Sequence, residues 1–220
     1  MDNMFRAVVF DMDGVITDTE KLYRRYQLEI GRRLGIPDDV MTVACEKIAG
    51  GNKFTNKPRF EAVVGRGIDY LEFRAEVIKN LDAHIRTYGV ELKPGVAETL
   101  KYLKEKGVKV GLATSTARDR ATGYLKSHQI DQYFDKLVFG DAIAHGKPAP
   151  DIYLKACEML DVKPEEAIAV EDSINGIVSA GSAGMYPVMV IDLIEPNDTT
   201  KQYAKKVFEF GRIDRLKELI

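Results

Sequence analysis

Apolar and polar residues alternate with two different periods along the chain. The positions at which the period changes divide the chain into segments. A short apolar run at 7–10, bounded by Gly14, is typical of a strand covered on both faces of a sheet. Between residues 17 and 89, by contrast, apolar residues recur at the three- and four-residue spacing of helices. We therefore predict helices over about 22–34, 38–49, 56–64 and 69–88.

Beyond Pro94 and Gly95 the two periods alternate, as expected of successive helix and strand units in a parallel sheet. This alternation predicts an α/β fold with a doubly wound (Rossmann-like), mostly parallel sheet. A polar segment at 195–200 has the composition of a surface loop. The predicted helices are 96–106, 117–128, 151–160 and 174–183, and the predicted strands are 108–113, 137–139, 167–170 and 187–191.

The helical stretch interrupts the α/β pattern directly after the first strand. We therefore predict two domains: an α/β catalytic core formed by residues 1–16 and 90–220, and an inserted all-helical cap formed by residues 17–89. The insertion begins immediately after an acidic segment. The cap is therefore expected to act as a lid over that segment.

Composition narrows the possible partners. The chain of 220 residues has a formal net charge of −2, which gives no electrostatic reason to bind nucleic acid or an acidic membrane. No window approaches the roughly 18 apolar residues of a membrane span. Cys45 and Cys157 both lie in predicted helices, which argues against a disulfide framework and fits a reducing compartment. We expect a monomeric cytoplasmic protein without a nucleic-acid or membrane partner.

Two carboxylates, Asp11 and Asp13, follow the first predicted strand. In open α/β sheets, ligands bind at the carboxyl ends of the strands. Two like charges in a partly dry site are costly unless they share a cation or a proton, and a ligand set of oxygens alone favours Mg²⁺. The same Asp-x-Asp-Gly pattern also suits a solvated turn, so this segment alone leaves both interpretations open.

Three further strand ends carry polar groups. Thr114 and Ser115 offer hydroxyls and the start of a helix, which suit a phosphate; Lys147 precedes a proline; and Glu171 and Asp172 form a second acidic pair. Each has an ordinary alternative: a helix cap, a surface lysine, and acids beside a helix N-terminus. Because the carboxyl ends of parallel strands meet at one edge, we expect these groups to share a crevice.

The motifs in this order resemble those of the haloacid dehalogenase-like phosphohydrolase superfamily. They are Asp-Met-Asp-Gly at 11–14, Thr114, Gly-Lys-Pro around Lys147, and Glu-Asp-Ser-x-Asn-Gly at 171–176. The segment at 180–185 and the helical insertion make the chain most similar to the β-phosphoglucomutase-like branch, which also contains small-molecule phosphatases.

The resemblance implies a role for each matching residue. Asp11 matches the nucleophile that forms an aspartyl-phosphate, and Asp13 matches the general acid and base. Thr114 and Lys147 match the clamp that neutralises the phosphate oxygens, beside Ser115. The resemblance also implies a small phosphoester substrate and a Mg²⁺ ion. Its ligands would be Asp11, Asp13 through its backbone carbonyl, Asp172, and Glu171 directly or through water.

The cap indicates which reaction is favoured. Mutases of this branch carry a His shortly after the first motif and an Arg in the lid loop, where this chain has Tyr23 and Lys53. Lysine lacks the planar fork that binds phosphate bidentately. We therefore favour a phosphatase acting on a small phosphorylated metabolite such as a sugar phosphate, with a mutase as the alternative. A non-catalytic ligand-binding protein is less favoured because the whole motif set is present.

Asn52 and Lys53 are the candidate substrate contacts in the cap, although a solvated loop between helices is the ordinary interpretation of this Gly-rich segment. The nearby Phe54 is expected to belong to the core of the cap.

Overall fold

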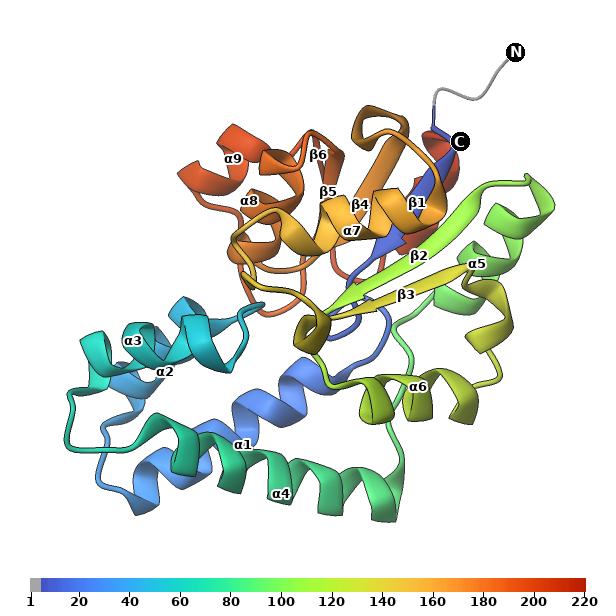
Figure 1. Ribbon diagram of the computed structural model, residues 1–220. Helices are drawn as coiled ribbons and strands as arrows, with labels where there is room; N and C mark the ends of the chain where they lie inside the picture. The colour runs from blue at the N-terminus through green and yellow to red at the C-terminus, as the bar shows by residue number, and fades with distance from the viewer. Residues whose placement is uncertain (1–4) are drawn as a thin grey trace.

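The computed structural model describes residues 5–220, so residues 1–4 of the predicted core domain lie outside the described part. Within it, six parallel strands form one sheet in the order β3-β2-β1-β4-β5-β6 (Figure 1). This order places β1 at the centre and confirms the predicted Rossmann-like α/β fold. The strands are β1 (Ala7–Phe10), β2 (Lys109–Thr114), β3 (Lys136–Phe139), β4 (Ala167–Glu171), β5 (Tyr186–Val190) and β6 (Lys206–Phe208).

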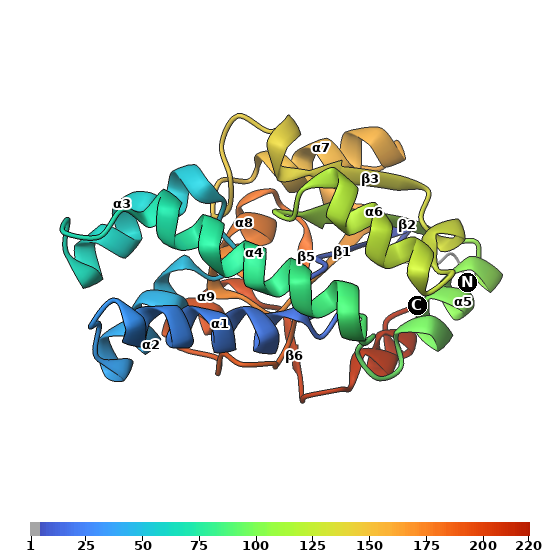
Figure 2. The same ribbon diagram turned by 90° about the horizontal axis from the view of Figure 1, so that it is seen from below.

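Each face of the sheet is buried under its own layer of helices. Because side chains alternate along a strand, Val8 and Phe10 of β1 enter one hydrophobic cluster, and Ala7 and Val9 enter another. Viewed from below, α6 lies in front of the strands, on the opposite side from α7 (Figure 2). The first cluster includes residues of α5 (Val96–Glu105) and α6 (Arg118–Ser127), and the second includes residues of α7 (Asp151–Leu160) and α8 (Ile174–Ser182).

The helical insertion has a hydrophobic cluster of its own. Phe60, Tyr70 and Phe73 lie at its centre, and the two Phe rings stack with centroids 4.9 Å apart. This separate cluster supports our proposal that residues 17–89 form a cap domain. The insertion comprises α1 (Thr19–Arg33), α2 (Asp38–Ile48), α3 (Lys53–Val64) and α4 (Tyr70–Tyr88).

The structure departs from the predicted elements mainly near the C-terminus. The loop predicted over 195–200 is wrong for its last three residues, which belong to α9 (Asp198–Tyr203). The Asn197 side chain accepts a hydrogen bond from the Thr200 backbone N–H at 3.0 Å, so polar residues that resemble a loop begin a helix. The short β6 and the 3₁₀ helix Ile213–Glu218 were not predicted, because three to six residues are too few to establish a period.

None of the helices in residues 5–220 is long and apolar enough to cross a membrane. Both cysteines are buried free thiols, in agreement with the prediction of no disulfide framework. Burial raises the pKa of the Cys45 thiol to about 12 and that of Cys157 to about 11.

Asp135, directly before the edge strand β3, binds β2 and α5 through its side chain, and its replacement should make the free energy of unfolding depend less on pH in the acid range. Its carboxylate accepts hydrogen bonds from the Val110 N–H at 2.7 Å and from Lys104 Nζ at 2.6 Å. Burial favours a higher pKa for Asp135, but the hydrogen bonds outweigh it and lower the pKa. We expect Asp135→Ala to lower the free energy of unfolding by about 1 kcal/mol at pH 7.

The sign of the pH dependence follows from that lowered pKa. The stabilisation by Asp135 is complete above the ordinary pKa of an aspartate and is lost as pH falls through the lowered pKa of the folded protein. Urea unfolding at pH 7 and pH 3 measures this, with Asp141→Ala, at an exposed carboxylate, as the control. A difference between wild type and Asp135→Ala that is equally large at both pH values would contradict the assignment.

Candidate active site

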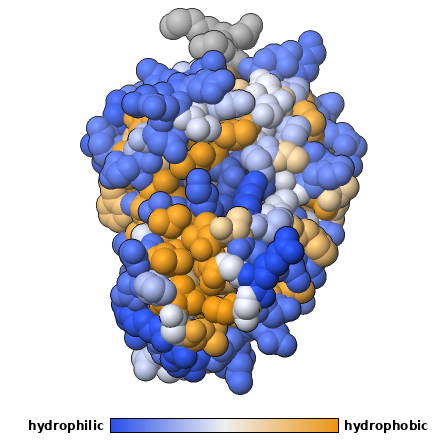
Figure 3. Space-filling view, turned by 90° about the vertical axis from the view of Figure 1, so that its left-hand side faces the viewer, coloured by the Kyte–Doolittle hydropathy of each residue, from blue (hydrophilic) through white to orange (hydrophobic). Residues whose placement is uncertain are grey.

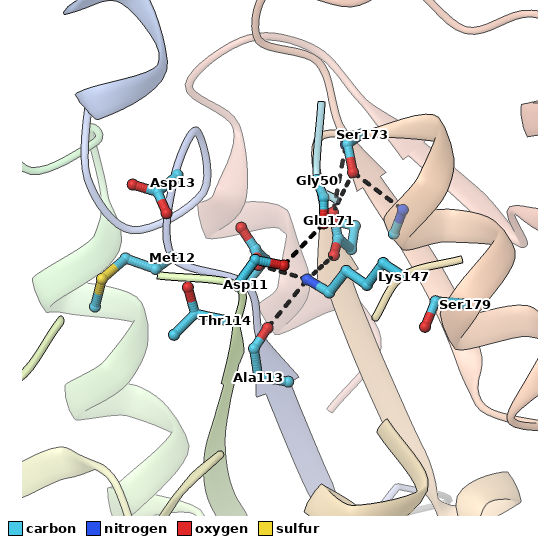
Figure 4. Close-up of polar contacts among 12 residues, drawn as sticks. Asp11, Met12, Asp13, Gly50, Ala113, Thr114, Lys147, Glu171, Ser173 and Ser179 are labelled. Carbon is cyan, nitrogen blue, oxygen red and sulfur yellow. Dashed lines mark hydrogen bonds and ion pairs between the residues drawn. The ribbon is translucent and has the colours of Figure 1, made fainter. Parts of the chain in front are cut away.

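The predicted site residues meet at the carboxyl edge of the sheet because the strands that carry them are neighbours. Phe10 of β1 is in register with Leu112 of β2 and Val170 of β4. Asp11 therefore emerges directly beside the ends of these two strands. Figure 4 shows Asp11, Lys147 and Glu171 converging at this edge, above Ala113 of β2.

Lys147 is a buried cation that joins the two acidic strand ends. Its ammonium group donates to Asp11 Oδ1 at 2.6 Å, Glu171 Oε1 at 2.5 Å and the Ala113 carbonyl at 3.1 Å. Burial opposes the charged form, but the two carboxylates outweigh it and raise the pKa of Lys147. The lysine is therefore a fixed positive charge in contact with the candidate nucleophile, and all three of its N–H groups are engaged.

Three buried carboxylates form the candidate metal centre. Asp11, Glu171 and Asp172 each offer an oxygen atom, and these atoms all lie within 4.8 Å of one another. Burial raises the pKa of Asp11 and of Asp172 well above the ordinary value, and neighbouring carboxylates add to the effect. A divalent cation would relieve this repulsion, and an all-oxygen set suits a hard ion. The residues present therefore fit a divalent metal.

The surrounding chain holds these carboxylates in place. Glu171 accepts hydrogen bonds from Tyr153 Oη at 2.7 Å and from Ser173 Oγ at 3.0 Å. Gly14 has φ +81°, and a Cβ at this position would lie 2.1 Å from Asp172 Oδ2. The glycine of the first motif is thus required both by the left-handed turn and by the close approach of Asp172.

Asp13 is held apart from the carboxylate cluster by two threonines. Thr19 Oγ1 donates to Asp13 Oδ1, and Thr116 Oγ1 donates to Asp13 Oδ2, both at 2.5 Å. These two hydroxyls lie at the start of α1 and after β2, and neither was predicted to contact Asp13. They fix the carboxylate of Asp13 at the wall of the pocket described below.

The two hydroxyls predicted to bind phosphate have different surroundings. Thr114 is completely buried, and its Oγ1 accepts a hydrogen bond from the Thr116 N–H at 3.0 Å. Ser115 lines the pocket, and its Oγ donates to the Gly50 carbonyl of the cap at 2.9 Å. Asn175, in the last motif, also contacts the cap, where Nδ2 donates to the Ala49 carbonyl at 2.7 Å. The core motifs therefore contact the loop between α2 and α3.

A pocket lies between the core and the cap, with about 860 Å³ of open space including the solvent at its mouth. Figure 3 shows hydrophilic surface in the hollow between the two parts, above a hydrophobic area of the cap. The core contributes Asp11, Asp13, Ser115, Thr116, Arg120 and Asp172, and the cap contributes, among others, Glu20, Tyr23, Arg24, Gln27, Asn56 and Arg74.

The polar cap residues that line the pocket differ from those predicted. Asn52 caps α3, where its Oδ1 accepts hydrogen bonds from the N–H groups of Phe54 and Thr55. Lys53 is exposed, and neither Asn52 nor Lys53 lines the pocket. Phe54 was predicted to be part of the cap core, which is wrong because it is 75% exposed.

Sequence reasoning missed Glu20, Arg24 and Gln27 of α1, although their spacing carries a signal. They stand at i, i+4 and i+7, which places them on one face of the helix. Burial, together with the nearby charge of Asp13, raises the pKa of the Glu20 carboxyl to about 7. The sequence signal for the polar cap residues of the pocket was therefore the polar stripe on α1, and not the loop after α2.

A family model described as haloacid dehalogenase-like hydrolase matches residues 5–184, which is more than half of the chain. The chain belongs to this family. The match covers all of the motifs that meet at the carboxyl edge of the sheet. It confirms the predicted haloacid dehalogenase-like family and the predicted enzyme class, a phosphoric monoester hydrolase.

Relatives of this haloacid dehalogenase-like hydrolase include phosphatases and a mutase. The phosphorylated carbohydrates phosphatase of Thermotoga maritima is 36% identical over 81% of this chain and 82% of its own length. The β-phosphoglucomutase of Bacillus subtilis is 33% identical over 94% and 97%. The structure of CbbY from Rhodobacter sphaeroides in complex with phosphate has 26% identity and a TM-score of 0.74, covering 93% of each chain.

Proposed function

We propose that this protein is a Mg²⁺-dependent phosphatase that hydrolyses a small phosphorylated metabolite, such as a sugar phosphate, through an aspartyl-phosphate on Asp11. The observation that carries the proposal is the contact of Asp11 with the buried Lys147, beside Asp172, at the floor of a pocket that Asp13 also lines. Nucleophile, cation and acid are thereby assembled at one strand edge.

The proposed reaction has two steps. In the first, Asp11 attacks phosphorus, the bond to the leaving oxygen breaks, and Asp13 gives that oxygen a proton. In the second, Asp13 takes a proton from water, which attacks the aspartyl-phosphate and releases inorganic phosphate with Asp11 regenerated. Lys147, Thr114 and Ser115 would offset negative charge on the phosphoryl oxygens.

Asp11, Asp172 and Glu171 are the side chains that we propose hold Mg²⁺, together with the Asp13 carbonyl. When bound, the ion supplies positive charge that favours both the ionised carboxylates and the phosphoryl oxygens. In the metal-free protein, burial and mutual repulsion disfavour the ionised forms of Asp11 and Asp172.

The lid loop of the cap, between α2 and α3, supports a phosphatase over a mutase. Lys53, which stands where the mutases carry the lid-loop Arg, is exposed and outside the pocket lining. The loop after α2 therefore contributes no cation toward a bound phosphosugar. Relatives named as phosphatases agree with this preference. A relative named as β-phosphoglucomutase makes a mutase the alternative to be tested.

One assay separates the two reactions. β-Glucose 1-phosphate is supplied with Mg²⁺ and a trace of the bisphosphate primer, and free phosphate and glucose 6-phosphate are measured in the same tube. Steady release of phosphate, followed by a wider panel of sugar phosphates, supports a phosphatase. Formation of glucose 6-phosphate without phosphate supports the mutase, and inactivity on the whole panel and on p-nitrophenyl phosphate argues against both.

Chelation of divalent metal should remove the activity. With EDTA in excess, turnover of p-nitrophenyl phosphate is expected to fall to background, because the carboxylate cluster loses the charge that balances it. Addition of Mg²⁺ beyond the chelator should restore the rate. Undiminished turnover after chelation and gel filtration would contradict the metal centre.

We expect Thr116 to affect turnover by positioning the carboxylate of Asp13. Thr116→Val removes the O–H that donates to Asp13 Oδ2 at 2.5 Å, and we expect kcat to fall about tenfold, the value of one hydrogen bond to a charged group. Thr122→Val, at a half-buried hydroxyl that bonds only to backbone carbonyls of α6, is the matched control. Equal kcat values for the two variants would show that Thr116 does not position Asp13.

A further inference from the structure

The cap side of the pocket carries two guanidinium groups without carboxylate partners. Arg24 of α1 and Arg74 of α4 both line the pocket and are half-buried. Within residues 5–220, no carboxylate oxygen lies within the 4.0 Å of an ion pair from either group. Glu20 is near enough to Arg24 for its pKa to be affected, but it forms no ion pair. A third pocket arginine, Arg120, is already paired with Asp82 at 2.9 Å.

Helix geometry places both groups on the wall away from the reaction centre. Thr19, at the start of α1, contacts Asp13, and Arg24 follows five residues later, about 7 Å further along the axis. On α4, Arg74, Ile78 and Leu81 line the pocket at i, i+4 and i+7. Since α4 ends at the connection back to the core, Arg74 is the member of this stripe furthest along the helix from that connection.

An unsatisfied polar group lies on the same wall. Asn56 of α3 lines the pocket, is only 5% exposed, and its Oδ1 has no hydrogen-bond partner among the described residues. Gln27 of α1 is 3% exposed and also lines the pocket. Buried amides and partly desolvated guanidinium groups are costly when they lack partners, so this wall is suited to a polar, anionic ligand group.

We propose that Arg24 and Arg74 bind a second anionic group of the substrate, so that the substrate is a phosphate monoester with a phosphate or carboxylate at its far end. This inference rests on the proposed phosphatase function and narrows its substrate class. Guanidinium forks match either anion bidentately, and Gln27 and Asn56 would contact polar groups between the two ends. The far anion is thus bound by the facing surfaces of two cap helices.

The test compares substrate pairs whose members differ in one anionic group. Fructose 6-phosphate is paired with fructose 1,6-bisphosphate, and glycerol 3-phosphate with 3-phosphoglycerate. The ratio of kcat/KM for the doubly to the singly anionic member is measured in wild type, Arg24→Gln and Arg74→Gln. We expect wild type to prefer the doubly anionic member of at least one pair, and each variant to lower that ratio about 10- to 100-fold. The preferred pair shows which anion is bound.

Arg25→Gln is the matched control, because Arg25 is the next residue of α1 but is exposed and does not line the pocket. It should keep the wild-type ratio. If a glutamine variant fails to fold, as judged by circular dichroism, the lysine variant replaces it and should lower the ratio severalfold through loss of the fork.

Two results would overturn the inference while the proposed function stands. One is wild-type turnover without preference for either doubly anionic compound, and the other is a preference that survives in both variants. No turnover of any ester, including p-nitrophenyl phosphate with Mg²⁺, would overturn the proposed function, and the inference would fail with it.

Discussion

Asp11→Asn is expected to abolish turnover while the protein remains folded. Asp11 Oδ1 lies 2.6 Å from Lys147 Nζ, and the Asp11 carboxylate also belongs to the candidate metal centre. A carboxamide is of similar size but is a poor nucleophile and a weaker metal ligand. We expect kcat for p-nitrophenyl phosphate to fall at least about 1,000-fold, as when a nucleophile is removed from other enzymes.

The stability of this variant provides an independent check. Burial raises the pKa of Asp11 well above its ordinary value, so the folded metal-free protein disfavours the ionised form. The free energy of unfolding of wild type therefore declines as pH rises above the ordinary pKa of an aspartate, whereas the Asn variant has no such charge. In EDTA at pH 7, Asp11→Asn should be at least as stable as wild type.

The control for Asp11→Asn is Asp119→Asn, which neutralises an exposed carboxylate at the start of α6. It should leave kcat unchanged and alter the free energy of unfolding by no more than about 1 kcal/mol, the effect of one exposed charge at a helix N-terminus. Turnover by purified Asp11→Asn at more than about one per cent of wild type, with a peptide mass that excludes reversion to Asp, would refute the nucleophile assignment.

The core elements could be predicted because their signals are local and reinforce one another. Val8 and Phe10 alternate with Ala7 and Val9 between two hydrophobic clusters, so a continuous apolar run correctly predicted a doubly covered strand. That these strand ends meet followed from topology, since the carboxyl ends of neighbouring parallel strands must be close. Asp11 and Glu171 therefore met as predicted.

The cap contacts could not be predicted in the same way. Asn52 was a reasonable candidate because it stands in a Gly-rich loop, but loop residues also begin helices, and its side chain caps α3. Arg24 and Arg74 are separated by 50 positions, and only the packing of α1 against α4 brings both to one pocket. Lys147 likewise looks like a surface lysine in sequence, because its carboxylate partners are 24 and 136 residues away.

Lys147→Met is expected to reduce both activity and stability. Methionine fills most of the same space, but it leaves Asp11 and Glu171 without the cation that lies between them. Breaking a buried ion pair by removing one partner typically costs about 3–5 kcal/mol. We expect a loss of that size in the free energy of unfolding in EDTA at pH 7, and a fall of at least about 100-fold in kcat, because the positive charge beside Asp11 that would offset the phosphoryl oxygens is gone.

A second substitution separates these two effects. In Lys147→Met with Glu171→Gln, one of the unpaired buried charges is gone. Tyr153 and Ser173 contact different carboxylate oxygens, so one of their hydroxyls donates to the new amide oxygen and the other accepts from the new amide N–H. Urea unfolding should therefore show that the double variant recovers part of the stability lost by Lys147→Met. Its activity should not recover, because no cation replaces Lys147 beside Asp11 and because Glu171→Gln also weakens the proposed metal centre. Recovery of turnover together with stability would show that Lys147 acts on the fold alone and takes no part in phosphoryl transfer.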